Sequence, residues 1–222
     1  MSQRRRTAIA GGICAMAGLA ASGCNILGFG GAMVESYRRS STHLVKATYT
    51  GLAGKSWAVI VSADRSLMGE NPDLVIWTTT KMTERLVQSQ KLIAASGFVP
   101  AERVLRFQYD NPGWAAKTHG ELLKALQCDR LIYVEITEYR LREPGNQYLW
   151  DGEATGTVSV YEAEASDEAA FDKALQVKFP DKQGYGPNDY PQRAVATILS
   201  TRFIDRATWL FYDHQEPYYP DY

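Results

Sequence analysis

Apolar runs and alternating segments predict a set of β-strands along the chain. Residues 57–61 (Trp-Ala-Val-Ile-Val) are all apolar, which predicts a central strand buried on both faces. Apolar and polar side chains alternate over residues 130–141 and 152–163, as they do in strands with one buried and one wet face. We predict a further strand at residues 175–179 and a short one at residues 98–99.

Three segments carry the signals of helices. Residues 71–96 begin with Asn-Pro-Asp and end before Gly97, and residues 118–126 open with a Thr-x-x-Glu capping box. Residues 191–211 carry an apolar stripe made of Val195, Ile198, Leu199, Phe203, Ala207 and Leu210. The resulting order, β-α-β-α-β-β-β-α, predicts an α/β (α+β) fold in which a mixed sheet has helices packed mainly on one face.

The first 24 residues resemble the signal sequence of a bacterial lipoprotein. Arg4, Arg5 and Arg6 precede a weakly apolar, uncharged stretch at residues 7–21, which is short for a permanent membrane span. Small residues then precede Cys24, as in the lipobox, where the peptide is cut before a cysteine whose thiol carries diacylglycerol. We therefore predict lipidation of Cys24; a plain signal peptide or an uncleaved anchor are the alternatives.

This interpretation predicts the domain organisation and the location. Residues 1–23 are the signal peptide, residues 24–50 the lipidated cysteine and a flexible tether, residues 51–213 a single α/β domain, and residues 214–222 a tail rich in Tyr and Pro. The lipid would hold the chain on a membrane, facing the periplasm. Asn25, rather than Asp, follows the cysteine, and the lipoprotein resemblance then implies the outer membrane more than the inner one.

Composition excludes several classes of protein. The 222 residues include 24 Lys and Arg against 25 Asp and Glu, a net charge of −1, so no basic balance points to nucleic acid. Hydrophobic residues make up 45% of the chain and aromatic residues 11%, which is enough to build a core and argues against disorder over most of the length. A mean hydropathy of −0.29 argues against a polytopic membrane protein.

No motif for catalysis stands out. Residues 54–56 (Gly-Lys-Ser) match the end of a phosphate-binding loop, but they precede a strand, so we interpret them as a turn. The three histidines lack metal-ligand spacing, and Cys128 sits where a small buried residue fits. Acidic pairs such as Glu162 and Glu164 are expected to be solvated. We predict no metal, no cofactor and no enzymatic activity.

A polar sheet face is the strongest candidate for function. If the two long strands pair, their alternation places on one face Tyr133, Glu135, Thr137, Tyr139, Thr155, Thr157, Ser159 and Tyr161. Tyrosine offers a broad ring with a polar tip, which suits recognition of a protein. We assign partner binding to Tyr133, Glu135, Thr137, Tyr139, Thr157 and Tyr161. The alternative is that this is only the wet face of an antiparallel sheet.

Several segments resemble a family of uncharacterised planctomycete-type envelope lipoproteins. The matching segments are residues 46–59 (KATYTGLAGKSWAV), 111–114 (NPGW), 126–135 and 148–161. More loosely, the element order resembles the amino-terminal domain of the Tol translocation protein B and the periplasmic domains of curli-secretion and polysaccharide-export lipoproteins. The resemblance covers about residues 46–210. It implies an envelope scaffold, often ring-forming, but the loop at residues 142–151 is too short for the membrane-inserting hairpins of the curli type.

Three classes of function follow. The first is a non-enzymatic envelope lipoprotein that binds a protein partner or itself. The second is an accessory lipoprotein of a polysaccharide or lipid export system, which would need an aromatic-lined groove. The third is a periplasmic hydrolase, which would need convergent acids, His or Ser in a cleft.

Overall fold

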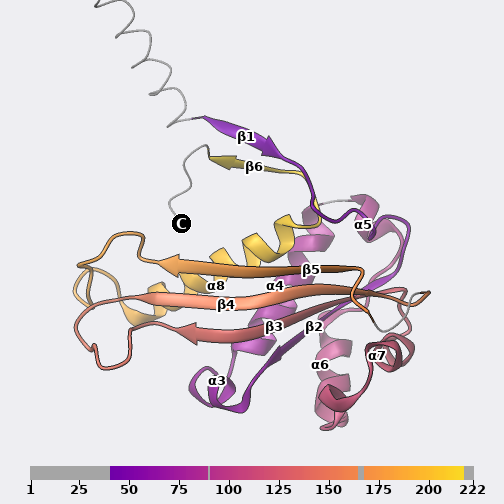
Figure 1. The fold of residues 1–222 in the computed structure, drawn as a ribbon, viewed down its shortest axis with the longest axis horizontal. Coiled ribbons are helices and arrows are strands. Elements are labelled where there is room, and N and C mark those ends of the chain that lie inside the picture. Colours follow the sequence, from indigo (N-terminus) through magenta and orange to yellow (C-terminus); the bar gives the residue numbers. More distant parts are fainter. Residues whose placement is uncertain (1–40, 90, 165–167, 218–222) are drawn as a thin grey trace, which may run out of the picture. The chain divides into compact units, whose positions relative to one another are not determined.

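A mixed four-stranded sheet is the centre of the fold (Figure 1), in a computed structural model that describes residues 41–89, 91–164 and 168–217. The strands are β2 (Trp57–Ala63), β3 (Arg130–Arg140), β4 (Gly152–Glu162) and β5 (Phe171–Phe179), in the spatial order β2-β3-β4-β5. β2 runs parallel to β3, and the other neighbours are antiparallel. The predicted α/β fold with a mixed sheet is confirmed.

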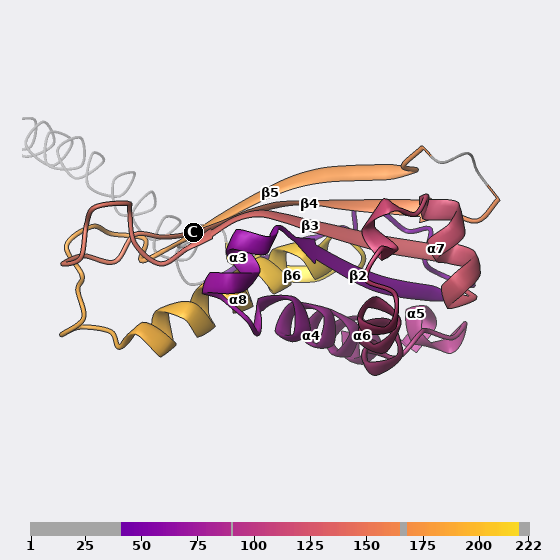
Figure 2. The same ribbon diagram turned by 90° about the horizontal axis from the view of Figure 1, so that it is seen from below.

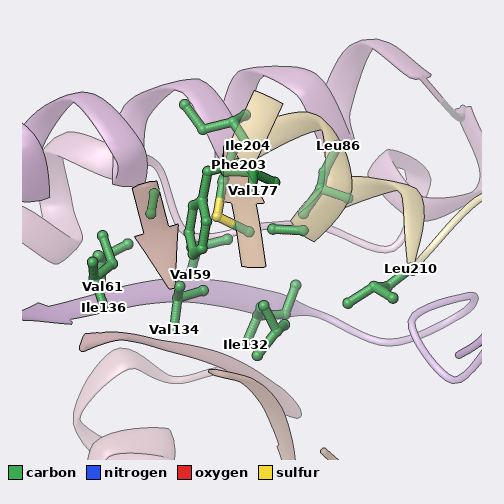
Figure 3. Packing of buried hydrophobic residues seen from close by; sticks show 14 of the residues in the cluster. Val59, Val61, Leu86, Ile132, Val134, Ile136, Val177, Phe203, Ile204 and Leu210 are labelled. Carbon is green, nitrogen blue, oxygen red and sulfur yellow. The ribbon is translucent and has the colours of Figure 1, made fainter. Parts of the chain in front are cut away.

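The two long helices, α4 (Leu74–Ser89) and α8 (Gln192–Trp209), pack on one face of this sheet (Figure 2). Their apolar stripes meet the inward residues of the strands in a core that includes Val59, Val134, Phe203 and Ile204 (Figure 3). Burial of this apolar surface is the main source of stability. The stripe predicted for residues 191–211 is confirmed, since Val195, Leu199 and Phe203 are all at most 3% exposed.

A smaller core lies on the other side of β2. Ala58, Ile60 and Leu131 pack there against α6 (Ala101–Asp110) and α7 (His119–Leu126). The predicted capping box is present, because Thr118 accepts a hydrogen bond from the Glu121 amide and the Glu121 carboxylate accepts one from the Thr118 amide. Short elements complete the unit: α3 (Arg65–Glu70), α5 (Lys91–Ala95) and the 3₁₀ turn η1 (Trp114–Ala116).

Some elements differ from those expected. β2 is buried on both faces as predicted, but it lies at one end of the sheet rather than in its centre. Helices cover both of its faces, so a uniformly apolar run arises without a central position. Residues 98–99 contribute a single bridge from Phe98 to Trp57 rather than a strand. The helix Ala101–Asp110 was not predicted, since its buried stripe is only Ala101 and Val104.

The described chain falls into two units. Val45–His214 form the compact unit that holds the four-stranded sheet. The other holds residues 42–44 and 215–217, which are most of the paired strands β1 (Thr42–Val45) and β6 (His214–Pro217). The Thr42 hydroxyl donates to the Gln215 side-chain oxygen at 2.9 Å. Part of the predicted tether is therefore a strand. Cys24, the signal peptide at residues 1–23 and most of the tether lie outside the described residues.

No helix in the described ranges has the length and hydropathy needed to cross a membrane.

Candidate functional site

The candidate site is the sheet face opposite α4 and α8, which we call the open face. Over the middle of β3, β4 and β5 it bears no helix in the described chain (Figure 2). Strand register places Tyr133 opposite Ser159 and Glu135 opposite Thr157. On β5 the neighbours of these positions are Asp172 and Ala174. The predicted pairing of the two long strands is thus confirmed, and it brings most of the predicted residues together.

Tyr139 does not belong to the open face. A β-bulge between Ile136 and Glu138 inserts an extra residue into β3, so that Glu138 takes the open-face position and Tyr139 turns to the core. Tyr139 is 5% exposed, and its hydroxyl bonds Ser200 at 2.8 Å and the Ala196 carbonyl at 3.1 Å, both on α8. Burial raises the pKa of Tyr139. Its assignment to partner binding was wrong.

One end of the open face is aromatic. The His119 ring stacks on Tyr161 with centroids 3.5 Å apart and meets the edge of Tyr133 at 5.4 Å. Trp114 approaches Tyr133 at 6.5 Å. Both tyrosines are half-buried. Their rings therefore hold α7 and η1 against the sheet as well as forming surface, a contact that strand alternation alone did not reveal.

The middle of the open face is small and polar. Glu135, Thr137 and Ala174 are exposed, and Thr157 is half-buried between them. The Thr137 hydroxyl donates to the Thr155 carbonyl at 3.3 Å, and this hydrogen bond links β3 to β4 at the bulge. This zone offers small side chains and the exposed Glu135 carboxylate, a composition that suits contact with another protein surface.

The other end of the open face is charged. Arg140 bonds Glu138 at 2.7 Å, the Asp151 carboxylate at 3.1 Å and Glu153. Glu153 is only 6% exposed and also accepts from Gln176. Burial works against ionisation of Glu153, but Gln176, Lys178 and Arg140 together lower the pKa of its carboxyl. This end is a set of mutually paired charges.

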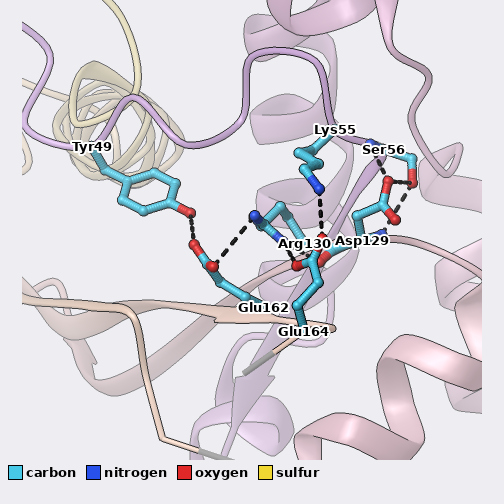
Figure 4. A network of polar contacts seen from close by, with 7 residues as sticks. All are labelled: Tyr49, Lys55, Ser56, Asp129, Arg130, Glu162 and Glu164. Atoms are coloured by element: carbon cyan, nitrogen blue, oxygen red, sulfur yellow. Dashed lines mark hydrogen bonds and ion pairs between the residues drawn. The ribbon is translucent and has the colours of Figure 1, made fainter. Parts of the chain in front are cut away.

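A second polar network ties the loop before β2 to the ends of β3 and β4 (Figure 4). The guanidinium of Arg130, 8% exposed, contacts Glu162 at 3.3 Å and Glu164 at 2.5 Å. Lys55 reaches Glu164 at 2.5 Å, and the Tyr49 hydroxyl donates to Glu162 at 2.9 Å. Glu164 is exposed, as expected, and Glu162 is half-buried. Both carboxylates are also paired with Arg130, a contact that was not predicted.

The electrostatics of this network match a structural role. Hydrogen bonds from Lys55 and Arg130 lower the pKa of Glu164 to about 2, and burial with a bond to Glu162 raises the pKa of Tyr49 to about 12. Ser56 donates its amide and hydroxyl to Asp129 at 2.9 and 2.7 Å. Residues 54–56 accordingly form the predicted turn, with Gly54 at φ 77°, and the Lys55 ammonium already has a carboxylate partner.

Cys128 lies beside a cavity of about 460 Å³ that runs along α7 to Tyr161 and Glu162. The residue is 7% exposed, and burial raises the pKa of its thiol to about 12. A thiol with that pKa is protonated at neutral pH, which is the state of an inert buried cysteine rather than a nucleophile. In the described ranges no three His, Cys, Asp or Glu side chains gather as metal ligands.

Comparisons with known proteins give structural likenesses only. No protein-family model matches the chain, and no curated protein matches it. Solved structures that it is similar to include lipoprotein GNA1162 from Neisseria meningitidis, at 11% identity and a TM-score of 0.44, covering 68% of this chain and 97% of that one. A PelC dodecamer from Paraburkholderia phytofirmans matches at 9% identity and 0.45, covering 78% and 99%. The hypothetical protein CT253 from Chlamydia trachomatis matches at 14% and 0.41, covering 68% and 92%.

Proposed function

We propose that this chain is a non-enzymatic bacterial envelope lipoprotein that binds a protein partner through the open face of its sheet. The observation that carries the proposal is the open face itself: three adjacent strands present a mainly polar surface with no helix over its middle in the described chain, and Glu135, Thr137 and Ala174 are exposed on it.

The chemistry of the open face favours a protein over a small substrate. Half-buried aromatic rings lie at one end, paired charges at the other, and Glu135 with small polar residues between them. Aromatic anchors beside a polar rim are the usual composition of protein interfaces. The charged groups of the two networks, Arg130 with Glu164 and Arg140 with Glu153, are engaged with each other, so they support architecture rather than proton transfer.

The proposed anchor is the lipid on Cys24, with the outer membrane as destination and the planctomycete-type lipoproteins as the family. The support for this part is the sequence alone: an Arg-rich start, small residues, then Cys24 followed by Asn25. A cysteine carrying two or three acyl chains holds a membrane firmly.

Capture from solubilised envelopes tests the proposal. We expect the variant Glu135→Arg with Thr137→Arg, both at exposed positions, to fold but to lose its partner, because two long cations in the middle of the face block close contact. Exposed changes of this kind alter stability by under about 0.5 kcal/mol, whereas a blocked interface loses about 2 kcal/mol or more. The matched control is Glu102→Arg with Thr197→Arg, on helices away from the open face.

The anchor is tested in the same preparation. Cys24→Ala is expected to release the chain from membranes and to leave capture unchanged. A folded open-face variant that keeps every partner contradicts the assignment of the face, and a Cys24→Ala chain that stays on membranes contradicts the anchor.

A further inference from the structure

β5 forms an edge of the sheet. It pairs with β4 on one side, and no other strand of the described chain pairs with it. An edge strand presents a row of backbone N–H and C=O groups that can pair with another strand. The carbonyl of Lys178 accepts from Arg202 at 2.6 Å, whereas Phe179 is opposite Gly152 and has its carbonyl directed at β4. Carbonyls alternate in direction along a strand, so Asp172, Ala174 and Gln176 share the outward orientation of Lys178.

The sequence of β5 places two pairs of residues at equal distances from Leu175, one aromatic and one of opposite charge. It reads Phe-Asp-Lys-Ala-Leu-Gln-Val-Lys-Phe from residue 171 to residue 179. Phe171 and Phe179 are equidistant from Leu175, and so are Asp172 and Lys178. Asp172 and Lys178 are both exposed, and both belong to the open face because they pair with Ser159 and Glu153.

We propose that β5 pairs with β5 of a second copy of this chain, antiparallel and with the two-fold axis at Leu175. In this register Asp172 lies opposite Lys178 of the partner subunit, and the reverse pair forms on the other side of the axis. Ala174 lies opposite Gln176 of the partner subunit in the same way. The backbone N–H and C=O groups that point outward from these two residues are then in position to form hydrogen bonds between the subunits. A two-fold contact must be self-complementary. The opposite charges of Asp172 and Lys178 meet that requirement in this register.

Two-fold axes at Lys173 and at Val177 do not give a self-complementary contact. An axis at Lys173 places Asp172 opposite Ala174 and leaves Lys178 beyond the paired strand. An axis at Val177 places Ala174 opposite Pro180, which has no N–H to donate. Each charge already has one contact within the subunit: Asp172 accepts a hydrogen bond from Ser159 at 2.6 Å, and the Lys178 ammonium is 3.6 Å from Glu153. Both residues stay exposed, and the Lys178 side chain is 55% exposed, so each keeps surface for a further contact. Of these three axes, only the one at Leu175 pairs Asp172 with Lys178. Because the Lys178 carbonyl already accepts from Arg202, the new backbone bonds of this register are those of Ala174 and Gln176.

The pairing would join two sheets into one, with both open faces on the same side. It leaves Glu135 and Thr157 accessible, because they lie on β3 and β4 rather than on the edge. The inference therefore does not depend on the proposed partner, and each can fail without the other.

Sedimentation velocity of the full chain in detergent tests this pairing through charge reversal. We expect wild type to dimerise, and Asp172→Lys and Lys178→Asp each to weaken the dimer at least tenfold, because each places like charges opposite each other twice. Mixing the two variants is expected to restore a dimer that contains one copy of each. Asp110→Lys and Lys124→Asp, which change exposed charges on α6 and α7, are the matched controls.

A backbone variant gives an independent readout. Ala174→Pro removes an outward N–H without touching the bonds to β4 and is expected to yield a folded monomer. The proposal is overturned if wild type stays monomeric as its concentration is raised. It is equally overturned if both charge variants dimerise as wild type does, or if the mixture forms no mixed dimer. Capture of the partner by the charge variants shows separately whether the open face binds.

Discussion

Tyr139→Ala is expected to lower the free energy of unfolding by about 3–5 kcal/mol, the usual loss for a large buried aromatic ring. The bulge in β3 turns this ring into the core, where it packs under α8 and bonds Ser200. Truncation removes the ring's contacts and leaves a cavity between β3 and α8. Denaturant unfolding followed by circular dichroism measures the change.

Two controls separate the ring from its neighbours. Tyr139→Phe keeps the ring and loses only the hydroxyl bonds, so we expect a loss of about 1 kcal/mol. Thr137→Ala, two residues earlier on the exposed side of the bulge, is expected to change stability by under about 0.5 kcal/mol. If Tyr139→Ala were as stable as wild type, the buried position of Tyr139 would be wrong. The strand would then alternate without a bulge, and Tyr139 would belong to the open face.

Gly156→Ala is expected to destabilise the protein by about 1–3 kcal/mol through overpacking. Gly156 pairs with Ile136 in the middle of β4, and a methyl group there would overlap the Glu135 carbonyl oxygen and lie 3.1 Å from the Phe203 ring. The backbone oxygen belongs to the paired strand, so relief requires the two strands to separate. Thermal and denaturant unfolding report the loss.

Gly120→Ala is the matched control. Gly120 lies in the first turn of α7, where an added methyl group meets nothing within 4 Å. Alanine favours helix over glycine by up to about 1 kcal/mol, so this variant should be as stable as wild type or more so. If Gly156→Ala were equally harmless, the close approach of β3 to β4 at Gly156 would be wrong.

Much of the open face could be predicted from alternation, because side-chain direction in a strand has a period of two residues. Tyr133, Glu135, Thr157 and Tyr161 all lie where that rule places them. Tyr139 does not, because the bulge adds a residue within Thr-Glu-Tyr, and no glycine or proline marks the change.

Contacts between distant segments could not be predicted from one sequence. The Arg130 network joins residues 49–56 to one end of the β3–β4 pair, and nothing in each short segment shows its partner. The stacking of His119 on Tyr161 is of the same kind, since a helix residue meets a strand residue more than forty positions away. The spacing rules describe neighbours along the chain, whereas these sites depend on tertiary packing.

Site-specific photo-crosslinking of the full chain in intact envelopes tests most directly whether the open face binds a partner. A crosslinking residue replaces Glu135 on the open face in one variant and Arg85, on the helical side of the sheet, in another. We expect the probe at Glu135 to yield one dominant adduct with another protein and the probe at Arg85 to yield none of that mass. An adduct of that mass from Arg85 alone, with none from Glu135, would contradict the account.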